Sequence, residues 1–205
     1  AGHDYFIVVD GWDPIFAASG EYVLAIDPFD AEMAPLVINE VDYDQVLSDD
    51  GEFIEIYNPT DDAVDLAGYT LELFNSATAN VYLSLPLILA GGPLEAGGYL
   101  VVGAEDVVAA LPAEAWSLAF SKAENNVENG EGDAARLRFV GTTVDGLSWE
   151  APTVGWTEST TAAEADSNEV EGSTGRCPNG ADTDDNSADF VFSTVPTPGE
   201  TNACD

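Results

Sequence analysis

Residues 36–75, LVINEVDYDQVLSDDGEFIEIYNPTDDAVDLAGYTLELFN, carry most of the information about the fold of this chain. Two runs of strand-forming residues, 36–41 and 52–58, flank an acidic loop. A third run, 69–74, follows a Pro-Thr-Asp-Asp turn. Short runs rich in Val, Ile, Tyr and Phe and bounded by turn residues are typical of β-strands. The stretch therefore predicts three strands joined by loops.

The central run, residues 52–58, has the pattern of a strand in a β-sandwich. Phe53, Ile54 and Ile56 are apolar strand formers, and Glu52 and Glu55 stand beside them. We expect the apolar side chains to face a core and the two glutamates to lie at a charged rim.

Weaker patterns along the rest of the chain predict a mostly β protein. The expected strands lie at 81–89, 99–102, 136–140, 147–149 and 190–195. Residues 106–116 predict a short helix that Pro112 interrupts, and residues 153–174 predict a long polar loop.

Several blocks of this sequence resemble the lamin-tail domain family, and the bacterial, secreted branch is the most similar. The opening blocks are INEV at 38–41, EFIEIYNP at 52–59 and VDLAGYTL at 64–71. The later blocks are GGYLVVG at 97–103, GDAARL at 132–137, GRCPNG at 175–180 and TPGETN at 197–202. The resemblance spans about residues 36–203. It implies an all-β, immunoglobulin-like β-sandwich with no known catalytic residues.

The first residues follow a different pattern. YFIVVDG at 5–11 and GEYVLAID at 20–27 resemble the last two strands of a bacterial pre-peptidase C-terminal domain. We therefore expect a partial domain at 1–27 whose remainder lies upstream in a precursor, a linker at 28–35, and the sandwich at 36–205.

A lone hairpin is marginally stable in water, so these two strands need a further sheet to pair with. We expect them to pair by β-strand addition within the chain, or with a second copy to build a homo-oligomer or polymer. The residues expected to set that pairing alternate along the strands: Tyr5, Ile7, Val9, Tyr22, Leu24 and Ile26.

The charge balance excludes some partners. The chain has 39 acidic and 4 basic residues and a formal net charge of −35. Nucleic acids and anionic membranes need clustered Lys and Arg, so both are poor partners. No apolar run approaches the about 20 residues of a membrane-spanning helix. The acids form either a solvated coat or sites for divalent cations.

Nucleophile-and-base catalysis and zinc binding both lack the residues that they require. The only histidine, His3, lies at the start of the chain, so a serine or cysteine nucleophile has no histidine base nearby in the sequence. Zinc prefers His and Cys ligands, which are scarce here. The sequence predicts a protein that is not an enzyme.

Calcium is the expected cofactor, because its ligands are oxygen atoms. Asp182, Asp184 and Asn186 alternate as in the first half of a calcium loop, and Asp189 could add a ligand. The loop is not an EF-hand, since Ser193 stands where the bidentate glutamate belongs; an Asx-rich turn is the alternative. A second acidic cluster predicts a cation site or a solvated loop, and its members are Asp42, Asp44, Asp49, Asp50 and Glu52.

The two cysteines, Cys177 and Cys204, predict a disulfide that ties the chain end to the loop before the last strand. A disulfide implies an oxidising compartment, so we expect a secreted or cell-surface protein. Trp156, in a polar loop, is a candidate platform for a sugar ring, and packing over the core edge is the alternative.

Together these features predict a non-catalytic extracellular structural or adhesive module that binds a protein or cell-surface component. A self-assembling subunit of an extracellular fibre or surface layer, joined by exchange of the N-terminal strands, is one alternative. An accessory domain of a secreted hydrolase is another.

Overall fold

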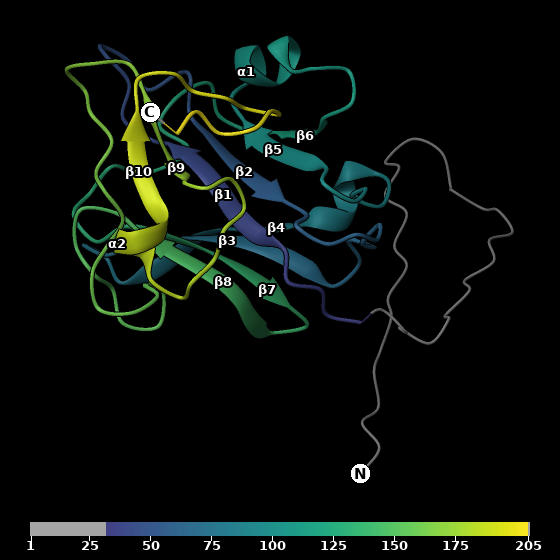
Figure 1. Cartoon of the computed structure of the whole chain (residues 1–205). Coiled ribbons are helices and arrows are strands. Elements are labelled where there is room, and N and C mark those ends of the chain that lie inside the picture. The colour runs from purple at the N-terminus through teal and green to yellow at the C-terminus, as the bar shows by residue number, and fades with distance from the viewer. Residues whose placement is uncertain (1–31, 205) are drawn as a thin grey trace, which may run out of the picture. The chain divides into compact units, whose positions relative to one another are not determined.

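The computed structural model describes residues 32–204, which form a two-layer β-sandwich (Figure 1). The chain divides after Asp30 into two units, and the described residues belong to the second. The expected strands within 1–27, with the assembly residues Tyr5 to Ile26, lie outside the described residues. The predicted all-β, immunoglobulin-like fold is confirmed.

Two sheets make up the layers. The larger has the strand order β10-β9-β1-β2-β5-β6, with bounds Phe190–Ser193, Ser173–Arg176, Val37–Asp42, Phe53–Tyr57, Tyr99–Gly103 and Trp116–Ala119. The smaller has the order β4-β3-β7-β8, with bounds Asn80–Pro86, Tyr69–Asn75, Ala134–Phe139 and Thr142–Ser148. The named strands pair antiparallel, except that β5 and β6 are parallel.

Short helical segments interrupt the strands at two places where the sequence predicted otherwise. The strand expected at 81–89 ends at Pro86, and a 3-10 turn, η1 (Leu87–Ala90), follows. The helix expected at 106–116 stops earlier, as α1 (Glu105–Ala110), since Pro112 cannot continue it. Trp116 instead begins β6, which the sequence analysis missed. A second short helix, α2 (Asn186–Asp189), precedes β10.

The core lies between the sheets and is built from alternate residues of the strands. In β3, Tyr69, Leu71 and Leu73 are buried and the residues between them are partly exposed, as period-two alternation requires. Trp149 is fully buried and stacks on Tyr43, with ring centroids 4.9 Å apart. Continuous apolar packing of this kind is the main force that holds the two layers together.

The prediction that Glu52 and Glu55 lie at a charged rim is wrong. Both are 0 % exposed: Glu55 because the outer face of β2 is covered, and Glu52, just before β2, because the 122–127 loop covers it. Gly199 N–H donates to Glu55 Oε2 at 2.6 Å, and Asn126 N–H donates to Glu52 Oε2 at 2.6 Å. Two loops thus bury glutamate side chains in and next to the central strand β2.

The acidic residues are therefore not only a solvated coat. Among the described residues, eight acids are buried: Glu40, Asp42, Glu52, Glu55, Asp133, Asp145, Asp166 and Asp189. Buried carboxylates require hydrogen-bond donors or cations, so they mark the parts of this domain where polar contacts determine the structure.

The predicted disulfide between Cys177 and Cys204 is confirmed, with 5.6 Å between the two Cα atoms. It holds the C-terminal segment against the start of the loop that follows β9. The disulfide therefore ties the chain end to this loop, as the sequence predicted.

Candidate functional site

The most unusual site of the domain is a buried arginine surrounded by carboxylates. Arg176, the last residue of β9, is 0 % exposed. Its Nη2 lies 2.9 Å from Asp145 Oδ1, and its Nη1 lies 2.9 Å from Asp189 Oδ2. Glu158, at 3.6 Å, and Asp182, at 3.2 Å, complete the group. One guanidinium therefore faces four carboxylates, which we call the Arg176 cluster.

The Arg176 cluster ties together segments from both sheets. Arg176 belongs to the six-stranded sheet, and Asp145 belongs to β8 of the four-stranded sheet. Arg176 Nε donates to the carbonyl of Ile38 at 2.8 Å, and Ile38 N–H donates to Asp145 Oδ2 at 2.5 Å. The cluster is thus a polar bridge between the two layers, and a satisfied buried network of this kind helps to specify a single core arrangement.

Gly146 and Asn186 position Glu158, one of the four carboxylates of the Arg176 cluster. A Cβ atom at Gly146 would lie 2.3 Å from the carbonyl oxygen of Trp156, so only glycine lets the loop that carries Glu158 approach β8 this closely. Asn186 Nδ2 donates to the Gly146 carbonyl at 2.8 Å and to Glu158 Oε2 at 3.2 Å. The loop, β8 and α2 are therefore locked in one arrangement.

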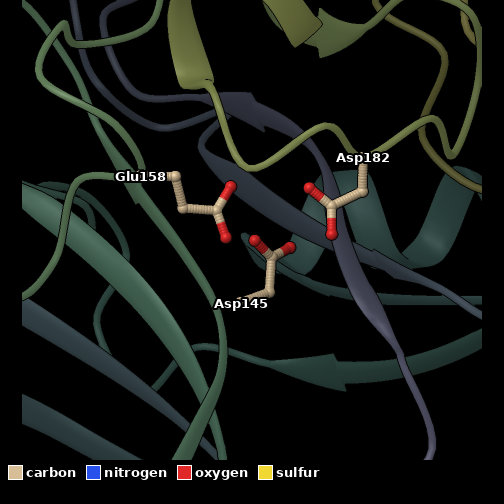
Figure 2. A group of neighbouring side chains, drawn as sticks. All are labelled: Asp145, Glu158 and Asp182. Atoms are coloured by element: carbon tan, nitrogen blue, oxygen red, sulfur yellow. The ribbon is translucent and has the colours of Figure 1, made fainter.

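Figure 2 shows Asp145, Glu158 and Asp182 pointing toward one another. Each offers an oxygen atom within 4.8 Å of the others, and they form the one such acidic group found among residues 32–204. The side chains of Asp145, Glu158 and Asp182 are 1 %, 14 % and 30 % exposed, so solvent reaches the group from the side of Asp182.

Burial shifts the titration of these groups. Desolvation raises the pKa of Glu158 to about 9, with repulsion by Asp145 as the next cause. Desolvation also raises the pKa of Asp145, and Arg176 offsets part of that rise. The pKa of Arg176 is raised, because the attraction of the surrounding carboxylates outweighs its desolvation. A proton or a cation is therefore favoured within the cluster.

The predicted calcium residues at 182–189 take different positions in the structure. Asp182 and Asp189 both contact Arg176, and Asp189 also accepts hydrogen bonds from Thr183 N–H and Oγ1. Asn186 is buried and uses its side chain on Gly146, Ser148 and Glu158. Asp184 is exposed, with a positive φ of 57°.

Asp182 is thus the one member of the predicted 182–189 set in the acidic group of Figure 2. Sequence reasoning missed Asp145 and Glu158, because β8 and the 153–163 loop are distant in sequence. A signal was available for Arg176: it is one of four bases in a chain of net charge −35.

The second predicted cluster is divided between the surface and the interior. Asp42 and Glu52 are buried, whereas Asp50 is exposed and Asp44 and Asp49 are partly exposed. Burial raises the pKa of Asp42 to about 8, and repulsion by Asp166 adds to the rise. Glu52 accepts the N–H groups of Asn126 and Val127, which fastens the 122–127 loop to β2. Glu52 therefore acts as a structural anchor for that loop.

A second buried polar network explains the TPGETN ending. Asn39, the residue at which the β1–β2 register shifts, donates to Glu55 Oε1 at 2.7 Å. Asn202 Nδ2 donates to the carbonyls of Asn39 at 3.0 Å and Arg176 at 2.9 Å. Gly199, at φ +83°, adopts the left-handed conformation that brings its N–H to Glu55. This network seals the C-terminal segment over β1 and β2.

Trp156 is packed over the edge of the core. It is 7 % exposed, stacks on Phe74 with 4.8 Å between ring centroids, and lies 3.9 Å from the Arg136 guanidinium. A sugar ring has no access to its face, so the sugar-platform hypothesis is wrong.

These arrangements define an immunoglobulin-like β-sandwich whose buried polar groups serve mainly to fix loops and termini. Residues 30–151 match the family model of the Lamin Tail Domain, so the chain belongs to the lamin tail domain family. The family is an interaction fold that is generally non-enzymatic. No curated protein matches the chain.

The family match ends at Ala151, before β9, α2, β10 and the disulfide. The cluster around Arg176 thus draws Asp145 from the matched region and its other members from beyond it. No helix among residues 32–204 combines the length and the apolar character that a membrane crossing requires.

Proposed function

We propose that this chain is a non-catalytic, protein-binding module that works outside the cell, secreted or at the cell surface. The observation that carries the proposal is that the buried polar side chains hold loops and the chain end in place. Arg176, Glu55 and Glu52 each fasten a loop or the chain end to a strand, which produces a rigid scaffold with fixed edges. Rigid scaffolds that present edges and loops are suited to recognition.

The disulfide supports the extracellular part of the proposal. Bonds of this kind persist in oxidising compartments and are rare in the cytosol. The Cys177–Cys204 bond closes a stretch with a sequence separation of 27 and holds the sealed C-terminal segment in place. A protein exposed to proteases and dilution benefits from such a closure.

Calcium is the cofactor that we propose for the acidic group of Asp145, Glu158 and Asp182. Oxygen ligands at 2.3–2.6 Å from a calcium ion lie no more than about 5 Å apart, and the three carboxylates meet that limit. Arg176 supplies one positive charge to four carboxylates, so a divalent cation would offset much of the remaining repulsion.

The test uses the oxidised, full chain on the surface of its native host cells. We expect saturable binding of the labelled protein, and we expect the binding to disappear after protease treatment of the cells. Fractionation should recover the tagged native protein outside the cytoplasm. Cytoplasmic residence, or the absence of protease-sensitive binding, would contradict the proposal.

A self-assembling subunit is the second candidate. The observation that favours it is the open edge of β4, which pairs with β3 alone among residues 32–204. A second copy could supply a strand to that edge. Light scattering at rising salt is the test, because screening the charge of −35 should promote assembly. A monomer at all protein and salt concentrations would exclude this candidate.

A further inference from the structure

The edge strand β4 is open to pairing. It stands at the end of the order β4-β3-β7-β8. Within residues 32–204, its backbone pairs with β3 alone. The opposite edge, β8, is covered: Asn186 binds both Gly146 and Ser148, and Ala163 N–H donates to the Ser148 carbonyl at 2.9 Å. The two edges of the same sheet thus differ: backbone groups of β8 are hydrogen-bonded to other segments, whereas those on the open side of β4 are not, within residues 32–204.

The sequence of β4 does not protect this edge. Natural edge strands carry charges, especially lysine, or proline within the strand. β4 reads NVYLSLP, with no charged residue in a chain that is 21 % charged, and its proline stands at the end. Val81, Ile88 and Leu89, in and just after β4, are 41 %, 48 % and 62 % exposed. An edge of this kind is suited to binding a strand.

An apolar groove of about 230 Å³ runs beside β4. Tyr82, Leu83 and Leu85 form one wall, and Ala119 and Phe120, at the end of β6, form the other. The β3–β4 register shifts at Tyr82, which is the additional residue of a bulge. The Tyr82 hydroxyl accepts the N–H of Glu128 at 3.0 Å, so this wall is fixed. A strand added to β4 would direct alternate side chains into the groove.

The groove continues into an acidic cavity. Phe120, Ser121 and Lys122 line both spaces. The second cavity has a volume of about 510 Å³, and its acidic lining residues are Asp50, Glu105, Asp106 and Glu124. Four acids against one lysine favour a positively charged ligand at this end.

We propose that β4 is the docking edge for an extended, basic segment of a partner protein. The segment pairs with β4 as a fifth strand, places alternate apolar side chains in the Tyr82–Phe120 groove, and brings Lys or Arg to the acidic cavity. Main-chain hydrogen bonds supply affinity and the groove sets the register. This inference rests on the proposed protein-binding function and names its partner class.

Charge complementarity favours an external segment over the chain's own strands. Residues 1–31 contain six acids and no Lys or Arg, and a second copy carries a charge of −35. Either would bring further negative charge to the cavity lined by Asp50, Glu105, Asp106 and Glu124. A lysine-containing or arginine-containing segment of another protein removes that repulsion.

The test measures binding of a fluorescent nine-residue peptide of alternating valine and lysine to the oxidised, full chain by anisotropy. Ser84→Lys places a charge on the exposed middle of β4, and Val154→Lys adds the same charge at a fully exposed loop position. We expect Ser84→Lys to weaken binding at least tenfold and Val154→Lys to change it less than twofold. A valine–glutamate peptide should not bind.

Each other outcome overturns the inference. Equal binding to both variants would move the docking site away from β4 and leave the protein-binding function intact. No binding of the valine–lysine peptide, with retained protease-sensitive binding to cells, would refute the partner class alone. A dimer that Ser84→Lys dissociates would make a second copy the occupant. Slow amide exchange of β4 in the dilute monomer would make the chain's own segment the occupant.

Discussion

Replacement of Arg176 by methionine tests the interpretation of the buried cluster most stringently. The change keeps a long side chain and removes the charge that Asp145, Glu158, Asp182 and Asp189 share. It also leaves the Ile38 and Ala181 carbonyls without their donor. Breaking a buried ion pair by removing one partner costs about 3–5 kcal/mol, so we expect a loss of that size at pH 8.

The loss should depend on pH. Without Arg176, the carboxyl group of Asp145 should bind a proton more tightly, because Arg176 offsets part of the rise that burial causes in its pKa. A tighter folded-state proton is bound more fully at low pH, so the destabilisation at pH 5 should be smaller than at pH 8. Protonation replaces part of the missing positive charge.

Urea unfolding, followed by tryptophan fluorescence, measures the free energy of unfolding of each variant at pH 5 and at pH 8. Arg138→Met is the matched control, because Arg138 forms an ion pair with Glu72 at 3.2 Å but its side chain is 30 % exposed. We expect this change to lower the free energy of unfolding by less than about 1 kcal/mol. Should Arg176→Met not fold, Arg176→Lys serves instead, because it keeps the charge but cannot reach all four carboxylates. Equal losses at Arg176 and Arg138, independent of pH, would refute the reasoning.

Three further predictions follow from the structure. The free energy of unfolding should fall as pH rises from about 5 to 9 at constant ionic strength. Burial raises the folded-state pKa of Asp166 to about 6, of Glu52 to about 7 and of Glu55 to about 8. The same carboxyl groups titrate near pH 4 in the unfolded chain, at about their ordinary pKa. The folded state binds more protons in this window, so urea titrations that show rising stability would contradict the assignment. Reduction of the Cys177–Cys204 disulfide, which closes a loop with a separation of 27, should lower the free energy of unfolding by about 3–4 kcal/mol. If intact mass shows two alkylated cysteines in the unreduced protein, the disulfide does not form. Calcium should raise the melting temperature of the native chain more than matched ionic strength does. Glu158→Gln should abolish the difference, whereas Glu114→Gln, at an exposed site, should leave it unchanged; equal shifts in both variants would place the ion elsewhere.

Local patterns were sufficient to predict the strands that form the centre of the sandwich. The runs around Ile38, Ile54 and Leu71 appear as β1, β2 and β3 within a residue or two of the expected bounds. β6 was missed because its four residues acquire strand geometry only by parallel pairing with β5, a contact that no local pattern encodes. The burial of Glu55 was missed for a related reason, since the residues that cover it lie 144 positions away.

The candidate site was predicted only in part. Asp182 was singled out by its acidic loop, but its neighbours in space, Asp145 and Glu158, lie on β8 and in a separate loop. Which acids of 39 come together depends on the packing of the two sheets, and Gly146 controls how closely the Glu158 loop approaches. Composition indicated an acidic protein, whereas only the tertiary structure distinguishes a solvated acid from a buried one.

Hydrogen exchange across the four-stranded sheet tests most directly whether this module binds through an open edge. In dilute, oxidised protein, the amides of β3 and β7 should be protected, and the outward amides of β4 should exchange fast. Addition of the valine–lysine peptide should slow exchange in β4 and leave β8, at the covered edge, unchanged. Protection of all β4 amides before any peptide is added, or protection that appears at β8 instead, would contradict the account.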